Sequence, residues 1–148
     1  MNWIFKRYDQ LTTDELYSIL QLRVEVFVVE QQCPYMELDA KDQVALHVLG
    51  YEHDQLVAYS RLFMPQSHDD NASIGRVIVR KEFRSEGYGK ELLETSIFEL
   101  RRTHPIATIY IQAQHYLLSF YQSFGFKETS DVYDEDGIPH IDMMLEKE

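Results

Sequence analysis

The chain has 148 residues, of which 45% are hydrophobic and 13% aromatic, and its formal net charge is −11. We expect one domain covering residues 1–148, because this length and composition can support a packed core. The acidic charge argues against non-specific binding to nucleic acid or to an anionic membrane, since both need a cationic surface.

Targeting and redox signals are sparse. No apolar run reaches the roughly 18 residues that a membrane span needs. The first residues, "MNWIFKRYDQ", lack the apolar segment of a signal peptide, so a cytoplasmic location is expected. Cys33 is the only cysteine, which excludes an internal disulfide. The histidines show no close ligand spacing with cysteine or carboxylate, so we expect no metal site.

The first part of the chain predicts a strand at residues 3–8 and a helix over residues 11–27. Thr12 and Glu15 fit a capping box at the helix start. Apolar residues then recur at helical spacing, at Leu16, Leu20, Val24 and Phe27. Residues 28–43 contain Pro34 and several carboxylates and predict a loop or a broken second helix.

The middle of the chain is rich in strand signals. Residues 45–63 contain two β-rich runs around a polar turn at residues 52–55, which predicts a hairpin. Residues 65–72 form a turn-rich loop, and "SIGRVIV" predicts the next strand.

The second half alternates helices and strands. A helix follows the segment with Gly87 and Gly89, and one of its faces is formed by Leu92, Leu93, Ser96, Ile97 and Leu100. A buried strand at residues 106–114, a short helix ending near Gly125 and a last strand from His140 complete the pattern. The order predicts an α/β fold, a mixed layer of helices around one central β-sheet.

The segment "RSEGYGK", Arg84 to Lys90, has a distinct chemistry. A helix start exposes unpaired N–H groups, and glycines let an anion approach them. Residues 76–90 carry five basic and two acidic side chains within this acidic chain. The local reversal of charge favours a small anionic ligand.

Two common phosphate motifs do not fit this segment. A Walker A loop needs glycine where Arg84 stands and serine or threonine where Glu91 stands. A dinucleotide-binding fingerprint needs a third glycine where Leu92 stands, and it normally follows the first strand. Both are therefore excluded.

A third motif matches. "VIVRKEFRSEGYGKELL" resembles the acetyl-CoA motif of the GNAT acyltransferases, with R-x-x-G-x-G after a strand, and "FYQSFGF" resembles their second signature. "LRVEVFVVEQQCPYMELDAKD", "AYSRLF", "IGRVIV" and "DEDGIPHIDMM" resemble the ElaA-like branch of that superfamily. The resemblance covers nearly the whole chain and implies the GNAT-like acyl-CoA N-acyltransferase fold.

The resemblance implies a cofactor-binding segment for acetyl-CoA, which is a cosubstrate. The pyrophosphate would bind backbone N–H groups, and the pantetheine arm would pair with the preceding strand. The residues implied for these contacts are Val77, Ile78, Val79, Arg84, Ser85, Glu86, Gly87, Tyr88, Gly89 and Lys90.

The resemblance also implies an enzyme, an acetyl-CoA-dependent N-acetyltransferase acting on a primary amine of a small molecule or a protein. Tyr121 would donate a hydrogen bond to the departing thiolate. The strand "SIGRVIV" lacks the catalytic glutamate that some family members place there, so Glu30, His47 and His140 remain candidate bases. The alternative is a non-catalytic module that binds or senses acyl-CoA.

The acceptor is not specified by any motif. Two acidic groups of residues, Glu30, Glu37, Asp39 and Asp42, and Asp131, Asp134, Glu135 and Asp136, suggest a cationic amine. Carboxylates that only confer solubility would give the same pattern. The assembly is left open, with a homodimer as one option.

Overall fold

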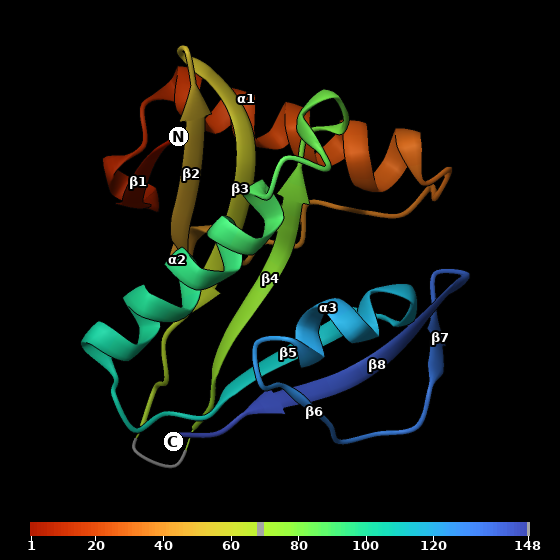
Figure 1. Cartoon of the computed structure of the whole chain (residues 1–148). Coiled ribbons are helices and arrows are strands. Elements are labelled where there is room, and N and C mark those ends of the chain that lie inside the picture. Colours follow the sequence, from red (N-terminus) through yellow and green to blue (C-terminus); the bar gives the residue numbers. More distant parts are fainter. Residues whose placement is uncertain (68–69, 148) are drawn as a thin grey trace.

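A single eight-stranded sheet with three α-helices packed on it forms the part of the chain that the computed structural model describes, residues 1–67 and 70–147 (Figure 1). In chain order the elements are β1 (Asn2–Arg7), η1 (Tyr8–Gln10), α1 (Thr13–Arg23), η2 (Val24–Glu30), η3 (Asp42–Val44), β2 (Leu46–Glu52), β3 (Gln55–Phe63), β4 (Ala72–Val79), η4 (Lys81–Phe83), α2 (Tyr88–Thr103), β5 (Ile109–Gln114), η5 (His115–Leu117), α3 (Leu118–Gln122), β6 (Lys127–Glu128), β7 (Tyr133–Glu135) and β8 (Ile138–Leu145). The predicted α/β fold with a mixed sheet is confirmed.

The strand order is β1-β2-β3-β4-β5-β8-β6, and β7 pairs with β8. All pairs are antiparallel except β4–β5, which are parallel. This parallel pair extends only over Ala72↔Ile109 and Ser73↔Tyr110. Beyond these residues the two strands diverge, as Figure 1 shows, and the sheet opens at its centre.

A β-bulge lies in β4 where the strands separate. Tyr59 pairs with Ile78 and Arg61 with Gly75, so Ser60 opposes two residues of β4. One of these is Arg76, whose φ of 50° lies in the left-handed region. Because a bulge bends its strand and increases the local twist, it accounts for the turn of β4 away from β5.

The two faces of the sheet are covered by different helices. Val48 of β2 packs in the cluster that contains Leu92 of α2, whereas the adjacent Leu49 packs with Ile19 and Leu22 of α1. Successive side chains of a strand point to opposite faces. Helices α1 and α2 therefore lie on opposite sides of the sheet, and each covers its own apolar cluster.

Helix α1 begins as predicted, with Thr12 and Glu15 forming a reciprocal capping box. Its buried face, however, is rotated from the predicted row: Ile19, Leu22, Arg23 and Val26 are buried, whereas Val24 is 39% exposed. The rotation turns Arg23 inward toward buried carboxylates. The helix then continues as the π-helical segment η2 to Glu30, before the loop expected for residues 28–43.

Two strands were not predicted from the sequence. β6 and β7 are only two and three residues long, too short for a periodic pattern. The hairpin between β7 and β8 turns at Asp136 and Gly137, with φ of 54° and 81°. The turn-rich loop at residues 65–72 includes residues 68–69, which lie outside the described residues. None of the helices described is long and apolar enough to cross a membrane.

Candidate active site

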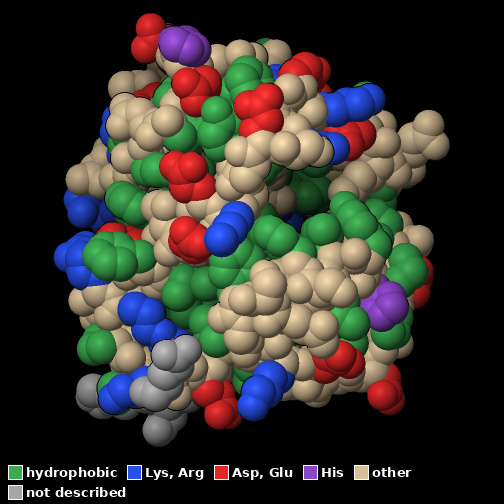
Figure 2. Space-filling model, viewed as in Figure 1, with side chains coloured by type: hydrophobic (Ala, Val, Ile, Leu, Met, Phe, Trp, Pro, Cys, Tyr) green, Lys and Arg blue, Asp and Glu red, His purple; other side chains and the backbone are tan. Residues whose placement is uncertain are grey.

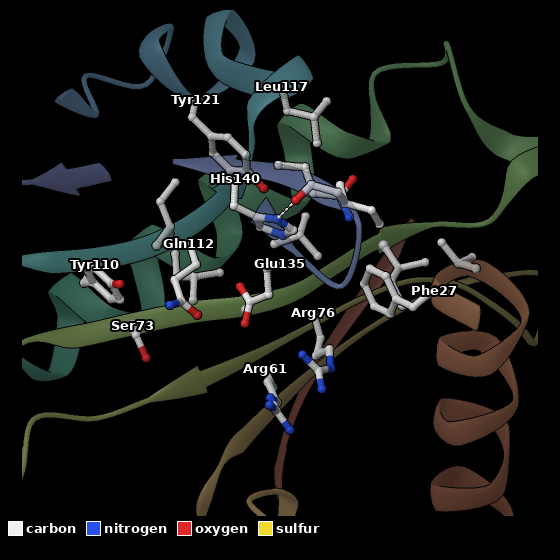
Figure 3. Close-up of a pocket in the computed structure, with 18 of the residues that line it drawn as sticks. Phe27, Arg61, Ser73, Arg76, Tyr110, Gln112, Leu117, Tyr121, Glu135 and His140 are labelled. Carbon is white, nitrogen blue, oxygen red and sulfur yellow. Dashed lines mark hydrogen bonds between the residues drawn. The ribbon is translucent and has the colours of Figure 1, made fainter. Parts of the chain in front are cut away.

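A cleft of about 1140 Å³ occupies the gap between β4 and β5. Its lining comes from η2 and the loop after it, from β4 and β5, from the segment before α2, and from α3 and the β7–β8 hairpin. Figure 2 shows a hollow in this face bordered by hydrophobic side chains, with charged groups around it. Figure 3 shows the side chains of both walls pointing into it.

The β4 wall presents a free strand edge. Val77, Ile78 and Val79 line the cleft, and on their other side Ile78 and Val79 pair with β3. β5 pairs only with the first two residues of β4, so within the described part of the chain no strand pairs with this edge at residues 77–79. An unpaired edge offers N–H and C=O groups to an extended, amide-bearing ligand.

The glycine segment, Arg84 to Lys90, follows the end of this edge. Gly87 is the N-cap of α2 with φ of 84°, and none of the described side chains caps the helix. A Cβ built on Gly87 would meet no atom within 4 Å, so the space in front of the helix start is open. The first N–H groups of a helix have no acceptor within the helix. An uncapped start of this kind suits an anion.

Gly89 differs from Gly87. A Cβ there would lie 3.7 Å from Phe120 Cζ and 3.9 Å from Val79 Cγ2, which is ordinary contact. Packing alone therefore does not demand glycine at position 89. Ser85, two residues before Gly87, also has a positive φ, of 70°, so the backbone turns tightly before α2.

Arg84, expected beside the phosphates, is engaged with Glu30 in a two-bond ion pair. Hydrogen bonding from Arg84 lowers the pKa of Glu30. This carboxylate lines the cleft but is a weakened proton acceptor. Its contact joins η2 to the glycine segment.

Tyr121 is held by α3 on the wall opposite β4. The side chain is 5% exposed and packs edge-on against Phe120 and Phe126, with centroids at 5.2 and 6.0 Å. Burial raises the pKa of its hydroxyl, which stays protonated at neutral pH. The residue lines the cleft, and its hydroxyl has no hydrogen-bond partner among the described residues. It is therefore a free donor for a ligand.

His140 lies on β8, on the same side of the cleft (Figure 3). Its Nδ1 is 2.8 Å from the carbonyl oxygen of Ile138. A carbonyl only accepts, so Nδ1 carries the proton and, in the neutral ring, the lone pair is on Nε2. The ring stacks on Tyr133 at 6.1 Å, and the Tyr133 hydroxyl donates to Asp142 Oδ1 at 2.6 Å. These contacts fix the orientation of a potential base.

His47 lies elsewhere. It is fully buried, is not part of the cleft lining, and both ring nitrogens are occupied: Nδ1 lies 2.6 Å from the Tyr59 hydroxyl and Nε2 2.9 Å from the Asp42 carbonyl. Burial lowers the pKa of His47, so the ring is neutral. The structure therefore does not bring His47 together with Tyr121 and His140.

His47 lies beside a network of three arginines and three carboxylates, which was not predicted from the sequence. Arg23 Nε donates to Glu37 Oε1 at 2.9 Å and Nη1 to Asp42 Oδ1 at 2.6 Å. Arg61 binds Asp39 and Asp42, and Arg76 binds Glu37. Charge pairing is complete here, and it ties the loop after η2 to β3 and to the bulge of β4.

The two acidic groups of residues differ in the structure. Glu30, Glu37, Asp39 and Asp42 are all paired with arginines. In the second group, Glu135 and Asp136 line the cleft, whereas Asp131 and Asp134 do not. Among the described residues no cluster of three or more His, Cys, Asp or Glu could hold a metal ion.

A family model, curated relatives and solved structures all match this chain over most of its length. The model of the acetyltransferase (GNAT) domain matches residues 11–147. The chain therefore belongs to the GNAT acetyltransferase family. The open β4–β5 pair and the uncapped, glycine-rich start of α2 are the structural counterparts of the motifs that suggested it.

Its branch within the family is the ElaA-like one. Protein ElaA of Escherichia coli K12 is 41% identical over 99% of this chain and 97% of its own length, and the crystal structure of E. coli ElaA superimposes with a TM-score of 0.91. An acyl-CoA N-acyltransferase from Pseudomonas aeruginosa, 41% identical over 97% of this chain and 99% of that chain, also has a TM-score of 0.91. A GNAT acetyltransferase from Elizabethkingia anophelis with acetyl-CoA bound, 17% identical over 98% of both chains, shares the fold with a TM-score of 0.66.

Proposed function

We propose that the protein transfers the acetyl group of acetyl-CoA to a primary amine by direct attack of the amine on the thioester. The observation that carries the proposal is the free edge of β4, which lines the cleft and leads to the uncapped start of α2. An extended arm with a diphosphate at one end matches these two features in order. Acetyl-CoA bound to the Elizabethkingia enzyme, which has the same fold, supports this choice of ligand.

The backbone would make most of the contacts. N–H groups of residues 84–90 would bind the pyrophosphate, and Val77, Ile78 and Val79 would pair with the amides of the pantetheine arm. Arg84 would add its charge after exchanging Glu30 for phosphate. Because these contacts are made by the main chain, we expect a change of side chain at Val77 to reduce the affinity for coenzyme A less than a change at Gly87.

The amine must lose a proton before it can attack. The pKa of an alkyl ammonium, ~10.4, lies about 3.4 units above pH 7. Converting it to the neutral amine at pH 7 therefore costs roughly 4.6 kcal/mol. His140 is the base that we propose, because its Nε2 is free and its ring is fixed. Glu30 is paired with Arg84, and both nitrogens of His47 are occupied, so these two candidates suit the role less well.

The thiol is the easier side of the reaction. The ammonium form of the acceptor gives its first proton to solvent. As the new C–N bond then forms and the C–S bond breaks, the neutral amine passes its second proton to His140, and the electron pair of the C–S bond leaves on sulfur as a thiolate. A thiol with a pKa of ~8.5 leaves readily. Tyr121, buried and protonated, would donate a hydrogen bond to the thiolate and would not transfer its proton completely.

A direct test is to incubate the protein with acetyl-CoA and a library of primary amines, following thiol release and the mass of the acetylated product. We expect amine-dependent thiol release. Tight binding of coenzyme A without turnover on any amine would instead identify a module that binds or senses acyl-CoA. Absence of coenzyme A binding would contradict both functions.

A further inference from the structure

Glu135 is a carboxylate of the cleft for which the reaction gives no role. It is in β7 directly opposite Ile138 of β8, and Tyr133 is opposite His140. Directly opposed side chains of an antiparallel pair lie on one face, as do residues i and i+2 of a strand. Glu135 and His140 therefore point to the same side, and Figure 3 shows both in the cleft.

The charge of Glu135 is not neutralised by the protein. Within residues 1–67 and 70–147 its carboxylate forms no ion pair, and the side chain is exposed. The arginines that line the cleft are engaged elsewhere: Arg61 and Arg76 with Glu37, Asp39 and Asp42, and Arg84 with Glu30. Glu135 is thus available to a cationic ligand.

On the basis of the proposed function, we propose that the acceptor is an aliphatic diamine, or a chain bearing two such cationic groups, with one amine at Nε2 of His140 and the second, non-reacting ammonium on Glu135. A carboxylate beside the reacting nitrogen would stabilise its protonated form and oppose attack. Glu135 acts without this cost on a cation that keeps its proton.

The spacing of the two side chains suits this ligand class. Glu135 and His140 are diagonal neighbours across the hairpin, a relation that separates two residues by roughly 7–8 Å and their Cβ atoms by somewhat less. In an extended four-carbon diamine the two nitrogens lie roughly 6 Å apart, because five bonds of about 1.5 Å follow a zigzag path. The Tyr121 side chain, 5% exposed and without a hydrogen-bond partner for its hydroxyl among the described residues, faces the same cleft, so the space accommodates a polar ligand.

The test uses three probes that each contain four carbons and one primary amine at the chain end and differ at the other end: 1,4-diaminobutane, butylamine and 4-aminobutanoate. Each is titrated calorimetrically into the full chain saturated with coenzyme A, and each is assayed for acetylation. Two variants are compared with the unchanged protein. Glu135→Gln removes the charge in the cleft, and Asp131→Asn removes an exposed carboxylate outside the cleft lining.

We expect the diamine to bind about tenfold more tightly than butylamine. Glu135→Gln should abolish this preference while changing butylamine by less than about twofold, and Asp131→Asn should retain it. Raising the salt concentration should reduce the preference, since the contact is ionic.

The proposal is overturned if butylamine equals the diamine, if Glu135→Gln weakens both probes equally, or if 4-aminobutanoate binds best, which would point to Lys41 on the cleft wall. Acetylation of butylamine without a diamine preference would contradict this inference and leave the proposed acetyltransferase function intact. Loss of all turnover with retained diamine binding to Glu135 would contradict the proposed function alone.

Discussion

The two terminal nitrogens of Arg84 donate to both carboxylate oxygens of Glu30, at 2.5 and 2.9 Å, and its Nε donates to the carbonyl of Val79 at 2.8 Å. One side chain thereby joins the end of η2, the end of β4 and the glycine segment. Arg84, which we propose to contact the phosphates, is thus held by an anion of the protein itself. A diphosphate arriving at α2 would compete with Glu30 for it.

Replacing Glu30 by Gln should therefore strengthen coenzyme A binding, because the competing charge is lost. The gain should be up to about fivefold, since an exposed ion pair contributes roughly 0–1 kcal/mol. Calorimetric titration measures it. The matched control is Glu25→Gln, which removes the neighbouring pair with Arg80 at 2.8 Å and should leave the affinity unchanged. Weaker binding by Glu30→Gln would show that Glu30 supports the ligand site.

Gly87→Asp should weaken coenzyme A binding at least tenfold, or about 1.4 kcal/mol. The substitution places a negative side chain in the open space before the helix start and at a φ of 84°. Gly87→Asn is the control, because asparagine tolerates left-handed backbone and adds no charge. It should retain more affinity than Asp. If Gly87→Asp bound coenzyme A with full affinity, the proposed position of the phosphate at the start of α2 would be contradicted.

Tyr121→Phe should slow turnover about 100-fold while leaving coenzyme A binding intact. The hydroxyl has no partner among the described residues, so its loss should not destabilise the fold. The comparison is Tyr17→Phe, a change at a side chain that is 70% exposed on α1, with no effect on rate expected. Steady-state thiol release gives the rate. An unchanged kcat would restrict Tyr121 to packing.

His140→Asn should reduce kcat by roughly 100-fold with little change in coenzyme A affinity. Asparagine can still donate to the Ile138 carbonyl but has no basic nitrogen in place of Nε2. The rate of this variant should keep rising with pH toward the pKa of the amine, ~10.4, as the neutral amine accumulates. A variant with the parental pH profile would show that the proton goes elsewhere.

Arg23→Met should lower the free energy of unfolding by about 1.5–3 kcal/mol, because Glu37 and Asp42 lose their fully buried hydrogen-bond donor although Arg76 and Arg61 still neutralise their charges. Arg7→Met, which breaks an exposed pair with Asp9, should cost less than about 1 kcal/mol. Urea denaturation compares the two. Equal effects would mean that the buried network is not a structural anchor of the loop after η2.

The parts of the fold set by local sequence were predictable. The capping box of Thr12 and Glu15, the glycine-rich start of α2 and the hairpin at residues 52–55 each depend on neighbours within a few positions. The rotation of α1 was not predictable, because it depends on Arg23 meeting Glu37 and Asp42 across a loop.

The same limit applies to the site. That Glu30 is paired could not be inferred, since Arg84 is 54 positions away in sequence. His47 was a candidate base only until its two buried partners were known. Glu135 appeared in the sequence as one of four nearby carboxylates. Its common face with His140 follows from the pairing of β7 with β8, and β7, three residues long, is too short to be recognised in the sequence.

The most direct test of the account is a crystal structure of the protein with coenzyme A. We predict pyrophosphate oxygens within about 3 Å of backbone nitrogens between residues 84 and 90. We also predict pantetheine amides paired with the free edge of β4. A cofactor bound elsewhere, with the space before Gly87 empty, would contradict the account.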